Sequence, residues 1–435
     1  MRLIDSFSTT EALAEVFSDA SVAGAMLAVE VALARAEAQV GAIPADAVAA
    51  VEKAAREAAR NTAELARATQ RAGTPGIPIA RALASSGYAH WGATSQDIAD
   101  TALVLLLDRA RALVAADQAR LDAALAWLSE RHKSTVLLGR TLGQPAPPVT
   151  FGLKAAGWLA SLRRGWNRIA RAWESARIVQ FGGASGTLAS LGDQGMAVGS
   201  ALARELGLGW PDAPWHAHRD RFAEFVAACG VYTGSLGKMA RDVALLMQAE
   251  VGEASEPGGE GRGGSSTMPH KQNPIACSLA MAAAHRTPAL VAAYLSAMGA
   301  EHERGAGAWQ SEWATMAAVI QATGLAAASM AEAAEGLTVD ESKMRANIEA
   351  TLGVVFAERA MMMLAGAVGL EAARGLVETA VRRSQAERRR FRDVLAGMPE
   401  VTGHLSPEAL RELDSPEGYL GSAEPFRVRL LESKE

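Results

Sequence analysis

The sequence predicts an all-α protein, and three observations lead to that class. Proline collects between four long stretches that contain none, as expected of residues that break helices. The stretches are rich in the helix formers Ala, Leu, Glu and Arg, and apolar residues recur at helical spacing between Leu103 and Leu128. Alternating β-branched patterns are nearly absent. The four proline-free stretches are residues 79–144, 149–210, 215–256 and 289–398.

The order of these stretches divides the chain into three predicted domains. Residues 1–100 should form a domain of shorter helices, including one amphipathic helix from Asp19 to Gly41. Residues 101–340 should form a bundle of long helices, and residues 341–435 a small helical domain. At 435 residues the chain is long enough to bury two or three hydrophobic cores.

Composition argues against several classes of function. The net charge of -5 and the isoelectric point near 6.0 give no sign of nucleic-acid binding. Cys229 and Cys277 lie in apolar sequence and suggest neither a disulfide framework nor a zinc site. No secretory signal is evident, and no apolar run looks long and charge-free enough to span a bilayer. We therefore expect a cytoplasmic protein with no metal and neither nucleic acid nor membrane as a partner.

The first concentration of polar residues, His90–Asp97, precedes a long helix predicted from about Ile98 to His132. Thr94 and Ser95 are common at helix N-termini, so ordinary capping would explain their presence. Free hydroxyls and backbone N–H groups at the same place could instead bind a carboxylate. Residue type alone leaves both interpretations open.

The second polar segment, Gly139–Gly152, has three prolines within four residues and is predicted to be a rigid loop. It is either a plain connection between helices or a carrier of polar groups for a site. After Pro274 another long helix should run, with a kink at Pro288, to about Arg304. Arg304 ends a polar cluster on an otherwise apolar helix, so it is either a surface charge or an anion-binding group.

Two further segments are weaker candidates. Phe181–Gly195 is rich in glycine, but it lacks the lysine of a phosphate-binding loop and no strand precedes it. Trp215–Asp220 contains a His-x-His pair, which without further ligands is weak evidence for a metal. We interpret the second segment as polar residues at the start of a helix.

The third polar segment, Gly258–Asn273, joins a glycine-rich half to a reactive half. Five of the seven residues from Gly258 to Gly264 are glycine, which predicts a mobile loop rather than a helix. In the second half a hydroxyl, Ser265, stands six residues before Lys271. On a closing loop such a serine could act as a general base while the lysine stabilises negative charge on a substrate carboxylate. The alternative is a Gly/Ser linker before a helix.

The complete string from Gly264 to Asn273 resembles the Gly-Ser-Ser-x-Met-Pro-x-Lys-x-Asn signature of the fumarase/aspartase superfamily at every fixed position. Gly92–Asp97 and Arg140–Gln144 resemble two other motifs of that superfamily. The resemblance implies a homotetramer with active sites shared between subunits, no metal or organic cofactor, and Ser265 and Lys271 as catalytic residues. It implies substrate contacts from His90, Thr94, Ser95, Arg140, Thr141, Gln144, Ser266, Met268, Asn273 and Arg304.

One departure from the family pattern narrows the expected chemistry. In amine-releasing members a histidine follows the Arg-Thr pair and is oriented by a glutamate seven residues after the signature lysine. Leu142 and Ser278 occupy these positions here. A leaving amine needs a proton from a general acid, worth about 10²–10⁴-fold, whereas a carboxylate with a pKa of about 4 departs unassisted. We therefore expect an enzyme that opens or closes a lactone.

Further likenesses point to the cycloisomerase subgroup of the superfamily, whose members act on carboxymuconates. Two alternatives stay open: a C–N lyase like adenylosuccinate lyase, and a non-catalytic use of the fold. His216 or His270 could also supply a proton from elsewhere. The likenesses are Asp5–Phe7, Ala72–Pro78, Gly183–Gly192, Pro214–His216 and Glu301–Arg304.

Overall fold

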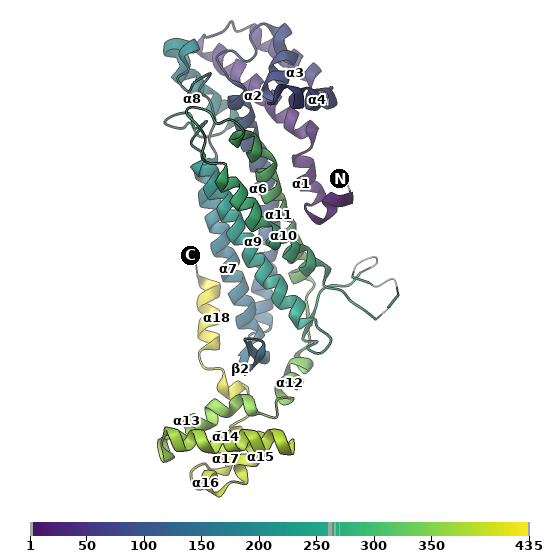
Figure 1. Ribbon diagram of the computed structural model, residues 1–435, viewed down its shortest axis with the longest axis vertical. Coiled ribbons are helices and arrows are strands. Elements are labelled where there is room, and N and C mark those ends of the chain that lie inside the picture. Colours follow the sequence, from purple (N-terminus) through teal and green to yellow (C-terminus); the bar gives the residue numbers. More distant parts are fainter. Residues whose placement is uncertain (1–2, 260–262, 265–266, 269, 434–435) are drawn as a thin grey trace. The chain divides into compact units, whose positions relative to one another are not determined.

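The computed structural model describes residues 3–259, 263–264, 267–268 and 270–433. These residues are mostly helical, which confirms the all-α class, and they add only two short antiparallel strand pairs (Figure 1). Contacts divide the chain into two compact units, and the three-domain division stays a prediction. Unit 1 comprises Met1–Ala119, Arg164–Lys238 and Leu279–Met330, and unit 2 comprises Arg120–Arg163, Met239–Ser278 and Ala331–Glu435.

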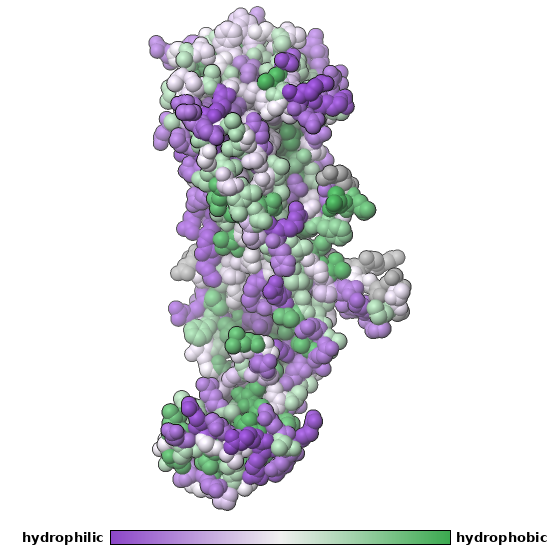
Figure 2. All heavy atoms as spheres, in the orientation of Figure 1, coloured by the Kyte–Doolittle hydropathy of each residue, from purple (hydrophilic) through white to green (hydrophobic). Residues whose placement is uncertain are grey.

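Helices of 6–12 residues pack against the 22-residue helix α2 in unit 1. The helix predicted from Asp19 to Gly41 is confirmed as α2, which ends where Gly41 adopts a left-handed φ of 82°. Figure 2 shows hydrophilic side chains gathered over α3 and α4, as expected for helices with one face in water. These helices are α1 (Glu11–Val16), α2 (Asp19–Val40), α3 (Ala47–Ala58), α4 (Thr62–Ala72), α5 (Gly76–Leu83) and α8 (Gly195–Leu206).

Four of the five long helices lie within the proline-free stretches, as predicted, and the fifth, α10, begins directly after Pro274. The helix α10 contains Pro288 but ends at Ser296, so the prediction that it continues to about Arg304 is wrong. Gly299, Gly305 and Gly307 follow this end, and glycine is among the poorest helix formers. The long helices are α6 (Ser95–Arg131), α7 (Phe151–Ala176), α9 (Asp220–Leu246), α10 (Ile275–Ser296) and α11 (Ala308–Glu335).

Within unit 1 the long helices pack through large side chains and close glycine contacts. Trp173 of α7 lies against Phe225 of α9, with ring centroids 5.0 Å apart. The Nε1–H of Trp173 also donates to Asp108 of α6 at 2.9 Å. A Cβ added to Gly237 of α9 would lie 2.4 Å from that of Ala284, so glycine permits α10 to approach. These contacts hold α6, α7, α9 and α10 together within unit 1.

In unit 2 the segment predicted to be a rigid loop instead forms a β-hairpin. Strand β1 (Val136–Thr141) pairs with β2 (Gln144–Thr150). Leu142 and Gly143, between the strands, have φ values of 53° and 75°. Positive φ at both central residues is the requirement of the type I′ turn, whose twist matches a tight hairpin. The prolines of β2 obscured the strand in the sequence, because proline is tolerated only in edge strands such as these.

The C-terminal part of unit 2 encloses its own apolar core, in which Phe356, Leu364, Phe391 and Leu395 are fully or almost fully buried. Residues with positive φ separate its helices, as Gly369 does between α13 and α14. Strand β3 (Ala254–Ser255) pairs with β4 (Thr338–Val339). The helices are α12 (Glu341–Glu349), α13 (Ala357–Val368), α14 (Leu370–Glu387), α15 (Phe391–Ala396), α16 (Pro399–Thr402), α17 (Pro407–Glu412) and α18 (Ala423–Glu432).

Two helices, α10 and α11, are more apolar than we expected from the sequence. By length and composition α10 and α11 could each cross a membrane, so the expectation that no apolar run reaches that limit is wrong. Their surroundings differ, because 67% of the apolar window of α11 is buried within the protein but only 28% of that of α10. Helix α10 therefore leaves apolar side chains such as Leu295 largely exposed.

Candidate functional site

Asp97 joins three segments of unit 1 at the start of α6. Its carboxylate is 1% exposed and has four hydrogen-bonding neighbours. A carboxylate offers about four acceptor positions, so Asp97 is fully engaged and does more than cap a helix. Its neighbours are the backbone N–H groups of Thr94 (3.0 Å), Gly182 (3.0 Å) and Gly183 (2.9 Å) and the Nε2 atom of His216 (2.7 Å).

The glycine-rich segment after Phe181 packs against this turn. Gly92 has a φ of 69°, and a Cβ there would lie 2.7 Å from the side chain of Leu191. Gly183 has a φ of 68°, and a Cβ there would lie 2.9 Å from the carbonyl oxygen of Gly92. Both positions need glycine for conformation and for space. Close packing thus explains Gly92 and Gly183 without a ligand.

Thr94 and Arg304, two predicted substrate contacts, are brought together in unit 1. The Nη1–H of Arg304 donates to Thr94 Oγ1 at 2.7 Å, and its Nη2–H donates to the carbonyl oxygen of Ala184. The Thr94 hydroxyl therefore meets a cation instead of acting as the helix cap. A guanidinium and a hydroxyl at the N-terminus of a long helix favour the carboxylate-binding interpretation over capping.

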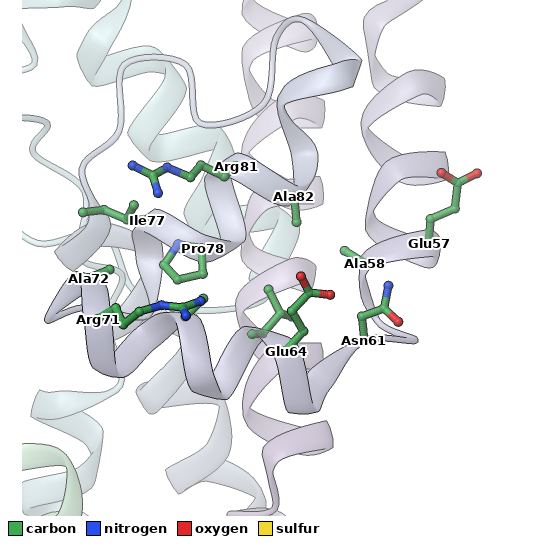
Figure 3. A pocket seen from close by; sticks show the side chains of 12 residues that line it. Glu57, Ala58, Asn61, Glu64, Arg71, Ala72, Ile77, Pro78, Arg81 and Ala82 are labelled. Atoms are coloured by element: carbon green, nitrogen blue, oxygen red, sulfur yellow. The ribbon is translucent and has the colours of Figure 1, made fainter.

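Ser95, the first residue of α6, lies against the start of α5. A Cβ on Gly76 would be 2.5 Å from the Cβ of Ser95, so only glycine fits there. Beyond Gly76, α5 borders a hollow of about 620 Å³ among α3, α4 and α5. Figure 3 shows Arg71 and Arg81 on either side of Pro78 in this hollow. Glutamates also line it, so neither sign of charge dominates there.

His90 is held by Glu30 of α2, a residue that the sequence analysis did not identify. The two oxygens of Glu30 accept the backbone N–H of His90 at 3.0 Å and face its Nδ1 at 2.7 Å. Burial disfavours the imidazolium, but the hydrogen bond and charge of Glu30, with the charge of Asp97, raise the pKa of His90 above its usual value. A charged residue among the apolar positions of α2 was the available signal.

A buried ionic cluster adjoins these groups and was also missed. Arg219, 3% exposed, pairs with Asp100 and Glu312 at 2.6 Å each. The Nε2–H₂ group of Gln96 donates to Asp100 and to the carbonyl oxygen of His216, which links the cluster to the first motif. His216 and Arg219 are therefore buried, and α9 (Asp220–Leu246) begins directly after them, as the sequence predicted.

In unit 2 Arg140 has a structural partner. Its two terminal nitrogens donate to both oxygens of Glu253 at 2.8 and 2.7 Å, and Glu253 is fully buried. Thr141 and Gln144 pair across the end of the hairpin, where both are exposed. Leu142 at the turn is 102% exposed and has a left-handed φ, two features that disfavour leucine.

The signature segment lies in unit 2 and is described in part. The backbone N–H and the side-chain Nδ2–H of Asn273 both donate to the carbonyl oxygen of Gly263, at 2.8 and 3.0 Å. Lys271 and Met268 are exposed. The predicted base Ser265 and its neighbour Ser266 lie outside the described residues.

The predicted site residues are thus divided between the two units. Unit 1 holds His90, Thr94, Ser95 and Arg304, and unit 2 holds the hairpin residues and the signature segment. Within the described part of the chain, no group of three or more His, Cys, Asp or Glu residues is arranged to hold a metal ion.

Comparison with known proteins gives consistent matches over the whole chain. A family model described as "Lyase" matches residues 6–288, and one described as "Adenylosuccinate lyase C-terminus" matches residues 353–430. A 3-carboxy-cis,cis-muconate cycloisomerase from Bradyrhizobium diazoefficiens is 45% identical over 98% of this chain and 97% of its own. A nitrosuccinate lyase from Streptomyces davaonensis is 40% identical over 93% and 89%. The crystal structure of a 3-carboxy-cis,cis-muconate lactonizing enzyme from Pseudomonas putida has a TM-score of 0.92 at 42% identity, covering 99% and 98%.

Proposed function

We propose a cycloisomerase activity for this chain, which belongs to the lyase family of the fumarase/aspartase superfamily. The substrate is 3-carboxy-cis,cis-muconate and the product is its lactone, 4-carboxymuconolactone. The reaction belongs to aromatic catabolism, in protocatechuate degradation through the β-ketoadipate pathway. Identity of 45% to a relative of this name over nearly the whole of both chains supports the assignment.

The observation that carries the proposal is the apolar tip of the hairpin. Leu142 stands where amine-releasing relatives have their general acid, and an alkyl side chain carries no transferable proton. The position of the orienting glutamate is held by Ser278, whose Oγ–H donates to the carbonyl oxygen of Pro274 at 2.6 Å. A leaving group that is already a stable anion needs neither residue, and the carboxylate released on opening a lactone meets that condition.

The proposed reaction proceeds through a carbanion stabilised as an aci-carboxylate. In lactone opening, Ser265 removes the proton from the carbon next to a carboxylate, and the electron pair moves into that carboxylate. Lys271 and Asn273 stabilise the added charge. The electrons then return to form the carbon–carbon double bond while the ring C–O bond breaks and the ring oxygen leaves as carboxylate. Lactone formation follows the same steps in reverse.

The other predicted residues bind the three carboxylates of the substrate. The contact between Arg304 and Thr94 at the start of α6 supports an anion-binding role for both. Arg140 is the weakest member, because Glu253 already neutralises it. The proposed substrate-binding residues are His90, Thr94, Ser95, Arg140, Thr141, Gln144, Ser266, Met268, Asn273 and Arg304.

The proposed assembly is a homotetramer in which each active site takes residues from several subunits. The exposed apolar face of α10 supports this proposal, since helices left so uncovered need a partner surface. The exposed Leu142 at the end of the hairpin supports it in the same way. We further propose a cytoplasmic location, no cofactor, and the three domains 1–100, 101–340 and 341–435.

The test is turnover of three substrates by the purified protein: 3-carboxy-cis,cis-muconate, adenylosuccinate and nitrosuccinate. Loss of 3-carboxy-cis,cis-muconate with appearance of the lactone is expected. Adenylosuccinate should be inert, because release of its amine needs the missing acid. Turnover of adenylosuccinate alone would overturn the proposal in favour of a C–N lyase, and inactivity on all three would favour a non-catalytic use of the fold.

The third substrate, nitrosuccinate, represents a second candidate function. Nitrous acid is about as acidic as a carboxylic acid, so nitrite can also leave without a proton donor, and a relative named nitrosuccinate lyase is 40% identical to this chain. The relative at 45% identity and the lactonizing-enzyme structure favour the carboxymuconate. A kcat/KM higher for nitrosuccinate than for the muconate would reverse this order.

A further inference from the structure

We propose that Glu30 is a positioning residue that holds His90 as an imidazolium whose Nε2–H binds a carboxylate of the substrate. The inference deepens the proposed function and rests on it. Three observations support it: the contacts of Glu30, the backbone conformation of His90, and the different condition of a second buried glutamate, Glu37, on the same helix.

Glu30 fixes the ring of His90 from two directions. One carboxylate oxygen accepts the backbone N–H at 3.0 Å, and the other faces Nδ1 at 2.7 Å. Glu30 is fully buried in unit 1, whereas the His90 side chain is 20% exposed. Of the two residues, the histidine is therefore the one that a ligand can reach. Nε2 of His90 has no hydrogen-bond partner among the residues described. It is therefore available to a ligand.

The backbone of His90 adopts a conformation that needs this support. Its φ of 60° lies in the left-handed region, which is unfavourable for a residue other than glycine. The bond from its N–H to Glu30 holds that conformation. His90 also lies four residues before Thr94, the hydroxyl that Arg304 contacts, so a cationic ring there adds to an existing anion-binding group.

Charge explains why a buried acid is needed. The groups that act on His90 are Glu30 on α2 and Asp97 on α6, and burial alone would favour the neutral ring. The two carboxylates together raise the pKa of His90 above its usual value, so the ring gains positive charge near neutral pH. A protonated ring donates from both nitrogens, one to Glu30 and the other to substrate.

Glu37 provides a matched control. It lies about two helical turns from Glu30, it is fully buried, and neither of its side-chain oxygens has a hydrogen-bond partner within the described structure. Burial, with the charge of Glu30, raises the pKa of Glu37 to about 9, so it is neutral at pH 7. Replacement of Glu37 by glutamine therefore makes the same substitution at a buried position of the same helix, but at pH 7 it removes neither a charge nor a bond to His90.

The experiment compares Glu30→Gln and Glu37→Gln with the wild type. Hydrogen–deuterium exchange at the imidazole Cε1, read by mass spectrometry of the peptide that contains His90, reports the pKa of that ring. Glu30→Gln should lower it by about one unit or more, and Glu37→Gln should leave it unchanged. An unchanged value in Glu30→Gln overturns the inference.

Kinetics test the link to substrate. Glu30→Gln should raise KM for 3-carboxy-cis,cis-muconate by about tenfold or more at pH 7.5, with a smaller effect on kcat, because a charge-assisted hydrogen bond is lost. The defect should shrink at pH 5.5, where the ring is protonated in both proteins. A defect of equal size at both pH values, or one shared by Glu37→Gln, indicates a purely structural role and overturns the inference. If the wild type does not turn over the muconate, the proposed function fails while the exchange experiment still decides the role of Glu30.

Discussion

Replacement of Asp97 by asparagine should destabilise unit 1 by about 3 kcal/mol. The Oδ1 atom faces Gly182 N–H and His216 Nε2, and the Oδ2 atom accepts Gly183 N–H and Thr94 N–H. If the asparagine NH₂ group replaced Oδ2, the N–H groups of Gly183 and Thr94 would both lose their acceptor. If it replaced Oδ1, His216 could change tautomer and accept from the NH₂ group, so only the Gly182 N–H would lose its acceptor.

The amide orientation that costs less free energy sets the expected loss of stability. One buried donor without a partner costs about 1–3 kcal/mol, and the remaining bonds weaken because the acceptor is no longer charged. Urea unfolding followed by tryptophan fluorescence measures the change in free energy of unfolding. Asp19→Asn is the control, because Asp19 is an exposed acid in the first turn of α2, where only about 0.3–1 kcal/mol of helix-dipole stabilisation is at risk. A loss below about 1 kcal/mol for Asp97→Asn would refute the reasoning.

Three further predictions concern catalysis and pH. Ser265→Ala should lower kcat by orders of magnitude while light scattering reports the same assembly as for the wild type; near-normal turnover would eliminate Ser265 as the base. Leu142→His should give no gain in the rate of lactone formation, because no acid is required, and a large gain in kcat would show that proton delivery limits the reaction. The free energy of unfolding should fall as pH rises from about 4.5 towards 9, because burial raises the pKa of Glu37 to about 9 and ionisation then favours the unfolded chain. Glu37→Gln should remove this contribution in urea titrations at several pH values, and an unchanged slope would contradict it.

Elements whose signals are local were predicted well. The structure shows Ser18 as the N-cap of α2 and Gly41 as its C-cap, so the residues that bound this helix are adjacent to it in sequence. The hairpin was missed, because its prolines mimic an irregular loop and its pairing depends on an edge strand. The end of α10 was placed too late, since an apolar pattern continues beyond Ser296 while glycines stop the helix.

In the candidate site, the sequence motifs predicted individual residues but not the contacts between them. The motifs identified Thr94 and Arg304 individually, but not that these residues, 210 positions apart, share a hydrogen bond. No motif indicated that Glu30 would contact His90, or that Asp97 would contact the loop at Gly182. Such partners depend on how separate helices pack, and one sequence read in short windows does not contain that information.

The most direct test of the central claim is a structure of the enzyme with a lactone or a close analogue bound. The account predicts that no imidazole or other protonated group lies within about 3.2 Å of the ring oxygen, because that atom leaves as a stable anion. It also predicts that Nε2 of His90 contacts a carboxylate outside the ring. A donor hydrogen-bonded to the ring oxygen, from His90 or any other residue, would contradict the claim that this site breaks the bond without acid catalysis.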